Sequence, residues 1–254
     1  MDVASGAGHG LKVGRGDPLQ TPLLYYSIAV LLIYAGLLSA ADRPKGYFSR
    51  LEELRNGIQE ISATKYVTVE DRRSDGKSRL MHLDIAFHYS RQTGKASIRF
   101  LRVDGLPNPG KAKRNAGNTP SVPKAGDEIT IDQAVPEPEW LLALDRNSDR
   151  WRIRAVKEKD GLLLEMRQLG RETGKPGKTI LLNGDRLPVR IRTFGVKGKV
   201  LDDVAVDWGT PNTVPFPSKI TITQYSRRNT LITTIVYSGT RIRSRSQAGS
   251  ADTQ

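Results

Sequence analysis

The sequence predicts a mainly β protein of the α+β class, built on one strongly curved antiparallel sheet. Three observations support this prediction. Apolar and polar residues alternate over many short segments between positions 66 and 243. Turn-forming residues separate these segments about every 8 to 14 residues. This spacing is typical of antiparallel sandwiches and barrels. Only two segments, 47–64 and 136–144, have the pattern of helices.

An uninterrupted apolar run over 23–41 precedes the sheet and has the features of an export signal. The small residues Ser39 and Ala41 suit signal peptidase, which would then cut before Asp42. The run is also close to the roughly 20 residues that span a bilayer. We therefore expect an exported, periplasmic protein, and the alternative is a chain anchored to the inner membrane by residues 23–41.

This interpretation divides the chain into three parts. Residues 1–41 would be a leader and signal peptide, residues 42–245 a single domain, and residues 246–254 a disordered polar tail. A domain of about 200 residues is long enough to bury a full core. The chain has no cysteine, which excludes disulfides, thiolate nucleophiles, zinc-thiolate sites and lipid attachment through a cysteine.

The chain is strongly basic, with a formal net charge of +13. For an exported protein this charge favours an anionic membrane surface, lipid head groups or acidic glycans as partners, and not nucleic acid. Lys and Arg are spread over many strands and turns with no compact basic block, so the alternative is that the charge serves solubility alone. We expect a monomer.

The first predicted element is a helix over 47–64. Its apolar residues recur every three or four positions, and its charged residues occupy the opposite side. The apolar residues are Phe48, Leu51, Leu54, Ile58 and Ile61.

A β-hairpin over 80–103 follows, with a turn at 92–95. One face of its first strand is apolar and the other is polar, and the second strand continues the apolar face with Ile98 and Phe100. The apolar residues of the first strand are Leu83, Ile85, Phe87 and Tyr89, and the other face has His82, Asp84, Ala86 and His88.

Residues 105–127 are rich in Pro and Gly, carry four basic residues and contain almost nothing large and apolar. We expect a flexible basic loop there. A strand near Ile129 and Ile131 then leads into a short central helix that includes Trp140 and Leu141. Proline followed by acidic residues favours a helix start at 136–139.

The remainder is predicted to be a strand meander, which brings the expected total to roughly nine to eleven strands. The predicted strands are 151–157, 162–169, 178–183, 187–194, 204–208, 218–225 and 231–243.

No set of residues has the pattern of a catalytic or metal site, and we expect a protein that is not an enzyme and has no cofactor. His82 and His88 would lie about 20 Å apart on an extended strand, too far to share a metal. Ser residues lack a nucleophile-elbow motif, and 174–179 lacks the spacing of a phosphate-binding loop. Acidic pairs such as Asp202 and Asp203 are interpreted as solvated loop residues.

The order of elements resembles the periplasmic outer-membrane lipoprotein-sorting family, the LolA/LolB-like proteins. The most telling stretch runs from the Leu-Pro-Val-Arg-Ile-Arg-Thr-Phe strand at 187–194 into Lys-Gly-Lys-Val-Leu at 197–201. A Pro-Glu-Pro-Glu-Trp-Leu-Leu segment at 136–142 and a Thr-rich strand at 230–237 add to the resemblance, which covers about 47–244. The loop at 105–127 departs from the family pattern.

The resemblance implies an open half-barrel whose N-terminal and central helices cover the concave face, and a carrier that binds acyl chains of lipoproteins or lipids there. The alternative is an anchored envelope interaction or sensor module with a closed core. The candidate ligand-binding residues are the expected inward-facing positions, together with the covering helix. They are Leu83, Ile85, Phe87, Ile98, Phe100, Trp140, Leu141, Trp151, Ile153, Val189 and Ile191.

Overall fold

The computed structural model describes residues 49–105, 123–132, 151–159, 161–168, 176–195 and 197–245. All of them belong to one compact unit, Ala35–Gln254. Within this part of the chain there is one α-helix, α2 (Ser49–Gly57), and one 3-10 turn, η4 (Pro211–Thr213). The mainly β prediction is therefore confirmed.

Eleven strands of the described residues form a single sheet. They are β1 (Ile58–Arg73), β2 (Ser78–Ser90), β3 (Lys95–Asp104), β4 (Glu128–Asp132), β5 (Trp151–Glu158), β6 (Gly161–Gln168), β7 (Lys178–Leu182), β8 (Pro188–Phe194), β9 (Val200–Gly209), β10 (Phe216–Tyr225) and β11 (Asn229–Ser244).

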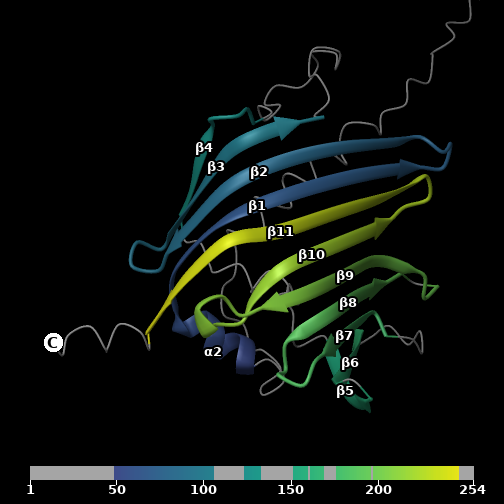
Figure 1. The fold of residues 1–254 in the computed structure, drawn as a ribbon. Coiled ribbons are helices and arrows are strands. Elements are labelled where there is room, and N and C mark those ends of the chain that lie inside the picture. Colours follow the sequence, from purple (N-terminus) through teal and green to yellow (C-terminus); the bar gives the residue numbers. More distant parts are fainter. Residues whose placement is uncertain are drawn as a thin grey trace, which may run out of the picture. The chain divides into compact units, whose positions relative to one another are not determined.

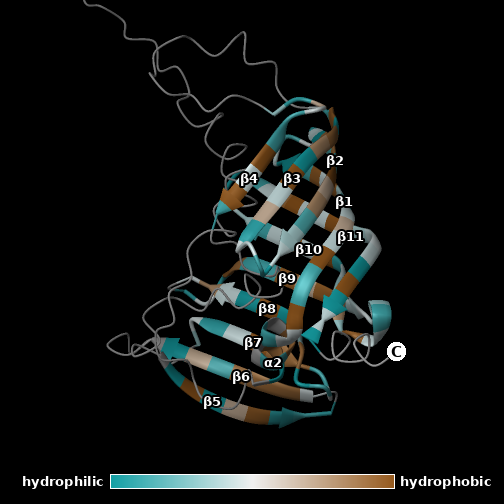
Figure 2. Cartoon of the chain, turned by 90° about the vertical axis from the view of Figure 1, so that its left-hand side faces the viewer, coloured by the Kyte–Doolittle hydropathy of each residue, from teal (hydrophilic) through white to brown (hydrophobic). Residues whose placement is uncertain are grey.

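The strand order is β4-β3-β2-β1-β11-β10-β9-β8-β7-β6-β5, and every neighbouring pair is antiparallel. The first and last of the described strands, β1 and β11, pair in the middle of the sheet (Figure 1). β4 and β5 are the two edges and do not pair with each other, so the described sheet is open. The strands change direction progressively between β1 and β5, as the usual twist of a sheet requires (Figures 1 and 2).

The predicted N-terminal helix over 47–64 is wrong beyond Gly57. α2 is only nine residues long, and Ile58 begins β1. Ile58 and Ile61 have helical spacing, but Ile61 pairs with Tyr89 of β2 and Ile242 of β11. Strand pairing on both sides thus overrides the local periodicity, and Gly57, a poor helix former, lies at the junction.

The other helix prediction and most of the loop prediction lie outside the described residues. The central helix, with Trp140 and Leu141, falls in 133–150, and the greater part of the basic loop falls in 106–122. The apolar run at 23–41 and the tail at 246–254 also lie outside them. Within the described ranges, no helix is long and apolar enough to cross a membrane.

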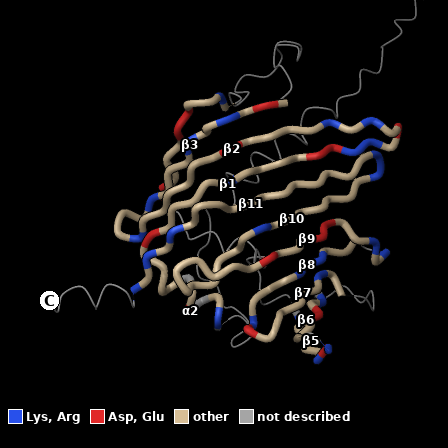
Figure 3. Tube along the Cα trace, viewed as in Figure 1, with Lys and Arg blue, Asp and Glu red and all other residues tan. Residues whose placement is uncertain are grey.

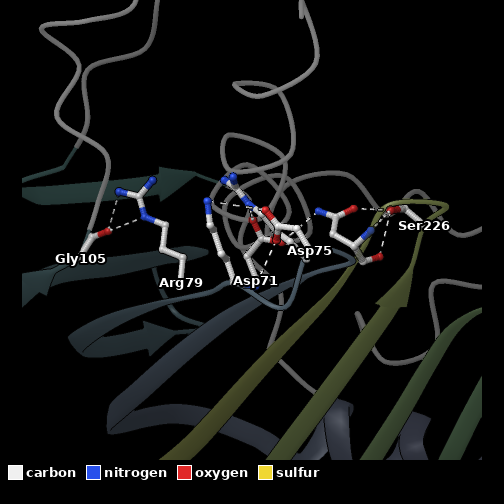
Figure 4. A network of polar contacts seen from close by, with 8 residues as sticks. Asp71, Asp75, Arg79, Gly105 and Ser226 are labelled. Atoms are coloured by element: carbon white, nitrogen blue, oxygen red, sulfur yellow. Dashed lines mark hydrogen bonds and ion pairs between the residues drawn. The ribbon is translucent and has the colours of Figure 1, made fainter.

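The hairpin ends of the β1–β2 and β10–β11 pairs are joined by polar contacts (Figure 4). The Asn229 side-chain amide donates a hydrogen bond to Asp71 at 3.0 Å, and the Ser74 amide donates one to the Arg228 carbonyl at 2.8 Å. Arg79 donates to the carbonyl oxygen of Gly105 at 3.1 and 3.2 Å. The first two bonds join hairpin ends that are far apart in sequence, and the Arg79 bonds join β2 to the residue after β3, so together they help to hold the central strands in register.

Lys and Arg gather at the turns that end β1, β2, β10 and β11 (Figure 3). Several of them are paired with a nearby carboxylate, as in the ion pairs Arg72–Glu70 at 2.7 Å and Lys77–Asp75 at 4.0 Å. These pairs are exposed, and exposed ion pairs add little stability. Part of the positive charge of the chain therefore lies at these turns, which we call the basic rim of the sheet.

The interpretation of Asp203 as a solvated loop residue is wrong, because Asp203 lies within β9. Arg190 of β8 donates two hydrogen bonds to its carboxylate, at 2.9 and 2.6 Å, and Arg192 donates a third at 3.2 Å. The hydrogen bond from Arg190 is the main reason that the pKa of Asp203 lies below its usual value, against the opposing effect of burial. The cluster joins β8 to β9.

We predict that Asp203→Asn lowers the free energy of unfolding by about 0.5–1 kcal/mol at neutral pH. A carboxyl with a lowered folded-state pKa stabilises the fold above its unfolded pKa, and this contribution is lost as the pH falls through the folded pKa. Urea unfolding should therefore show a difference from the unmodified chain that shrinks below about pH 4. Asp207→Asn, an exposed position on the same strand, is the control. A difference that does not change with pH would contradict this account.

We also predict that Gly161→Ala is destabilising. Gly161 has φ 157°, and a Cβ there would lie 1.9 Å from the carbonyl oxygen of Leu182. The backbone of the β5–β6 hairpin would have to move, at a cost of roughly 1–3 kcal/mol. Gly184→Ala is the matched control, because its Cβ would meet nothing within 4 Å. Thermal unfolding should show a lower midpoint for the first variant alone; equal midpoints would contradict the prediction.

Candidate functional site

The candidate site is one face of the sheet, which we call the buried face. Alternate residues of successive strands contribute to it, and the resulting alternation of apolar and polar bands is visible along β1, β2, β3 and β11 in Figure 2. Its members on the central strands are Ile61, Ala63, Lys65, Val67 and Val69 of β1, Met81, Leu83, Ile85, Phe87 and Tyr89 of β2, Ala96, Ile98 and Phe100 of β3, and Leu231, Thr233, Ile235 and Tyr237 of β11.

The buried face continues across the other half of the sheet. Ile220 of β10 pairs with Ile235 of β11 and with Val206 of β9. Ile191 of β8 pairs with Ile180 of β7, which pairs with Leu164 of β6. All of these side chains are buried. The apolar surface therefore runs without a break from β3 to β6.

Helix α2 is small beside this face. Nine residues at about 1.5 Å each give a helix of about 14 Å. Ten strand spacings of about 4.8 Å give a sheet about 48 Å wide. Leu51 and Leu54 of α2 are buried, and the helix contacts β1. By its size α2 cannot by itself account for the burial of the whole face.

Six of the sequence-predicted site residues lie on the buried face and are buried there. They are Leu83, Ile85, Phe87, Ile98, Phe100 and Ile191. The predicted division of the β2 residues between two faces is confirmed, since Leu83, Ile85, Phe87 and Tyr89 are buried while His88 is exposed.

The other predicted site residues are either half-buried or not described at the level of their side chains. Ile153 pairs with buried Met166 and is half-buried in β5. Val189 is half-buried at an irregularity in register, where Leu182 pairs with Pro188 and Leu181 with Arg190. Trp151 is the first residue of β5, and its side chain is not among the described ones. Trp140 and Leu141 lie outside the described residues.

Sequence reasoning missed the contribution of β1 and β11 to this face. Residues 61, 63, 65, 67 and 69 have the parity of a strand, but the first two of them lie in the helix that the sequence predicted over 47–64. On β11 every second residue is buried, namely Leu231, Thr233, Ile235 and Tyr237. The spacing of these residues in the sequence is enough to predict that they share one face.

Lys65 is the one charged side chain among the buried residues that the structure describes, at 3% exposure. Its Nζ lies 4.0 Å from the centre of the Phe87 ring and 5.9 Å from that of Tyr237. The Tyr237 ring in turn packs edge-on against Phe216, with 5.3 Å between ring centres. A cation at these distances from ring centres is attracted to the aromatic faces. A positive group is thus held on an otherwise largely apolar surface.

Histidines and carboxylates do not gather on this face. His82 accepts or donates a hydrogen bond with Thr68 at 3.3 Å, and the described residues contain no group of three or more His, Asp or Glu that could hold a metal ion.

No protein-family model matches the chain, and no curated protein matches it. Solved structures similar to it include a LolA superfamily protein from Nitrosomonas europaea, with 11% identity, 80% of this chain and 94% of that chain covered, and a TM-score of 0.44. A DUF1329 family protein from Desulfovibrio piger has 12% identity, covers 77% and 90%, and has a TM-score of 0.41. A domain described as an outer membrane lipoprotein-sorting protein, from Vibrio parahaemolyticus, has 12% identity, covers 78% and 91%, and has a TM-score of 0.38. The first and third come from the family that the sequence resembles.

Proposed function

We propose that this chain is a non-enzymatic carrier that binds the acyl chain of a lipid or lipoprotein on the buried face. The observation that carries the proposal is the extent of that face. Apolar side chains run across it from β3 to β6. A long alkyl chain is the ligand that matches such a surface, because it needs area and no specific polar partners.

The energetics support this assignment. Each methylene transferred from water to an apolar surface contributes about 0.8 kcal/mol. One long acyl chain can therefore offset the cost of association and still bind at micromolar concentrations or below. The basic rim of the sheet would add an attraction for anionic membrane surfaces that weakens with salt (Figure 3).

Phe87 and its neighbour His88 provide a matched test, because they lie on opposite faces of β2. We predict that Phe87→Glu lowers the retention of acyl lipids by at least about tenfold, since it places a charge on an apolar binding surface. His88→Glu should leave retention unchanged. Lipids that co-purify with each protein would be extracted and measured by mass spectrometry.

Phe87→Ala is the second variant, for the case in which the glutamate prevents folding. Circular dichroism would establish which proteins are folded. Retention that is unchanged in a folded Phe87 variant would contradict the proposed site. A folded, unmodified chain that takes up no acyl lipid would overturn the carrier function and favour the alternative, an anchored interaction or sensor module with a closed core.

The proposal also places the protein in the periplasm, on the evidence of the apolar run at 23–41 and the small residues Ser39 and Ala41. We predict that the chain isolated from an envelope fraction begins at Asp42, which native mass spectrometry measures together with any bound lipid. A chain that retains residues 23–41 would instead support the membrane anchor.

A further inference from the structure

One end of the sheet brings together basic turns that lie far apart in the sequence, and we call it the basic end. The turns after β1, β8 and β10 all lie there, because the strand register runs from β1 through β11, β10 and β9 to β8. Lys and Arg mark these turns in Figure 3. The exposed basic residues at and beside them are Arg72, Arg73, Lys77, Lys197, Lys199, Arg227 and Arg228.

Much of this charge has no neighbouring carboxylate. The residues beside the β1–β2 turn are paired within their own hairpin, as Arg72–Glu70, Arg73–Asp71 and Lys77–Asp75. Within the described ranges, no carboxylate forms an ion pair with the other four residues, Lys197, Lys199, Arg227 and Arg228. The carbonyl of Arg228 accepts a hydrogen bond from the Ser74 amide, a contact that involves no side chain. The guanidinium groups of the β10–β11 turn thus face water.

Large apolar side chains lie exposed among these charges. Tyr225 is 39% exposed, Leu201 41% and Leu80 50%. Tyr225 lies opposite Thr230, which lies opposite Arg72, so the three side chains form one row on the same side of the sheet. Leu201 is the second residue of β9, beside the end of β10, and Leu80 is the third residue of β2. Half of the six large exposed hydrophobic residues of the described ranges therefore lie at the basic end.

This combination fits the surface of an anionic phospholipid bilayer. A guanidinium donates paired hydrogen bonds to phosphate oxygens. A tyrosine has an apolar ring and a polar hydroxyl, which suits the boundary between head groups and acyl chains, and a leucine can enter that boundary. An acidic protein or polysaccharide would use the charges but would leave Leu80 and Leu201 in water. A bilayer is the partner that uses both kinds of side chain.

We propose that the basic end docks on an anionic phospholipid bilayer, with Arg227 and Arg228 against the phosphates and Tyr225 and Leu201 at the acyl boundary. The strands would then meet the membrane end-on, and the broad faces of the sheet would stay off it. This inference goes beyond the acyl-chain function, because it holds whether or not the buried face takes a ligand.

The first test measures sedimentation of the full-length chain with phosphatidylcholine vesicles, with and without phosphatidylglycerol. Each basic residue beside an anionic membrane raises the affinity roughly fivefold. We therefore expect Arg227→Gln/Arg228→Gln to weaken binding to the anionic vesicles about twentyfold, and added salt to weaken binding of the unmodified chain. Arg241→Gln/Arg243→Gln is the matched control, because it removes the same charge at the other end of β11. Its affinity should fall less than about threefold, and circular dichroism would establish that both variants are folded.

The second test reads the orientation. The chain has no cysteine, so one introduced cysteine carries an environment-sensitive fluorophore at a single place. Leu201→Cys places the label at the basic end, and Tyr66→Cys places it in the middle of β1 at a residue that is 46% exposed. We expect the emission of the Leu201→Cys label alone to shift to the blue on anionic vesicles. This comparison also holds if residues 23–41 insert into the bilayer, because it reports which part of the sheet reaches the membrane.

Four other outcomes would overturn the proposal. Equal losses in the two double variants would show that total charge acts and not the basic end. A shift of both labels, or of the Tyr66→Cys label alone, would show that a face of the sheet lies on the membrane. Vesicle binding without a shift at Leu201→Cys would exclude contact with the acyl boundary. Equal binding to neutral and anionic vesicles would exclude recognition of the phospholipid charge. Acyl-lipid retention by the Phe87 variants is measured separately, so either proposal can fail without the other.

Discussion

The pairing of β1 with β11 is the interaction on which the rest of the sheet depends. These two strands come from opposite ends of the domain, yet they pair along most of their length, from Ile58 opposite Ser244 to Arg73 opposite Asn229. Without this pairing the sheet would divide into one group of four strands and another of seven. Contacts between such distant segments carry a large entropy cost of loop closure, which the extended ladder of hydrogen bonds and the buried side chains must offset.

The same pairing places the candidate site. It aligns the apolar residues of β1 and β2 with those of β10 and β11, so that two short apolar surfaces become one. It also brings Tyr237 opposite Lys65, with Phe87 close by on β2. The contact between Lys65 and Tyr237 therefore exists only because β11 lies beside β1.

The hairpins were predictable because their signals are local. Between 151 and 244 the expected strands match the observed ones to within a few residues, since alternation and turn residues act over short distances. The start of β1 was not predictable in this way. Ile58 and Ile61 have helical spacing, and only their pairing with β2 and β11 makes them strand residues. For the buried face, alternation placed Phe87 and Ile98 on the apolar side, as the structure does, but it could not place Lys65 there.

The sequence by itself determined the mainly β class, the antiparallel hairpins and the division of each strand into an apolar and a polar side, because these follow from the period of two in an extended chain. Only the tertiary structure decided the strand order, the length of α2 and the setting of Lys65. A charged residue in an alternating pattern is ordinarily expected to face water. Here the parity of β1 and the strands on both sides of it leave Lys65 on the buried face, where nearby aromatic rings stabilise its charge.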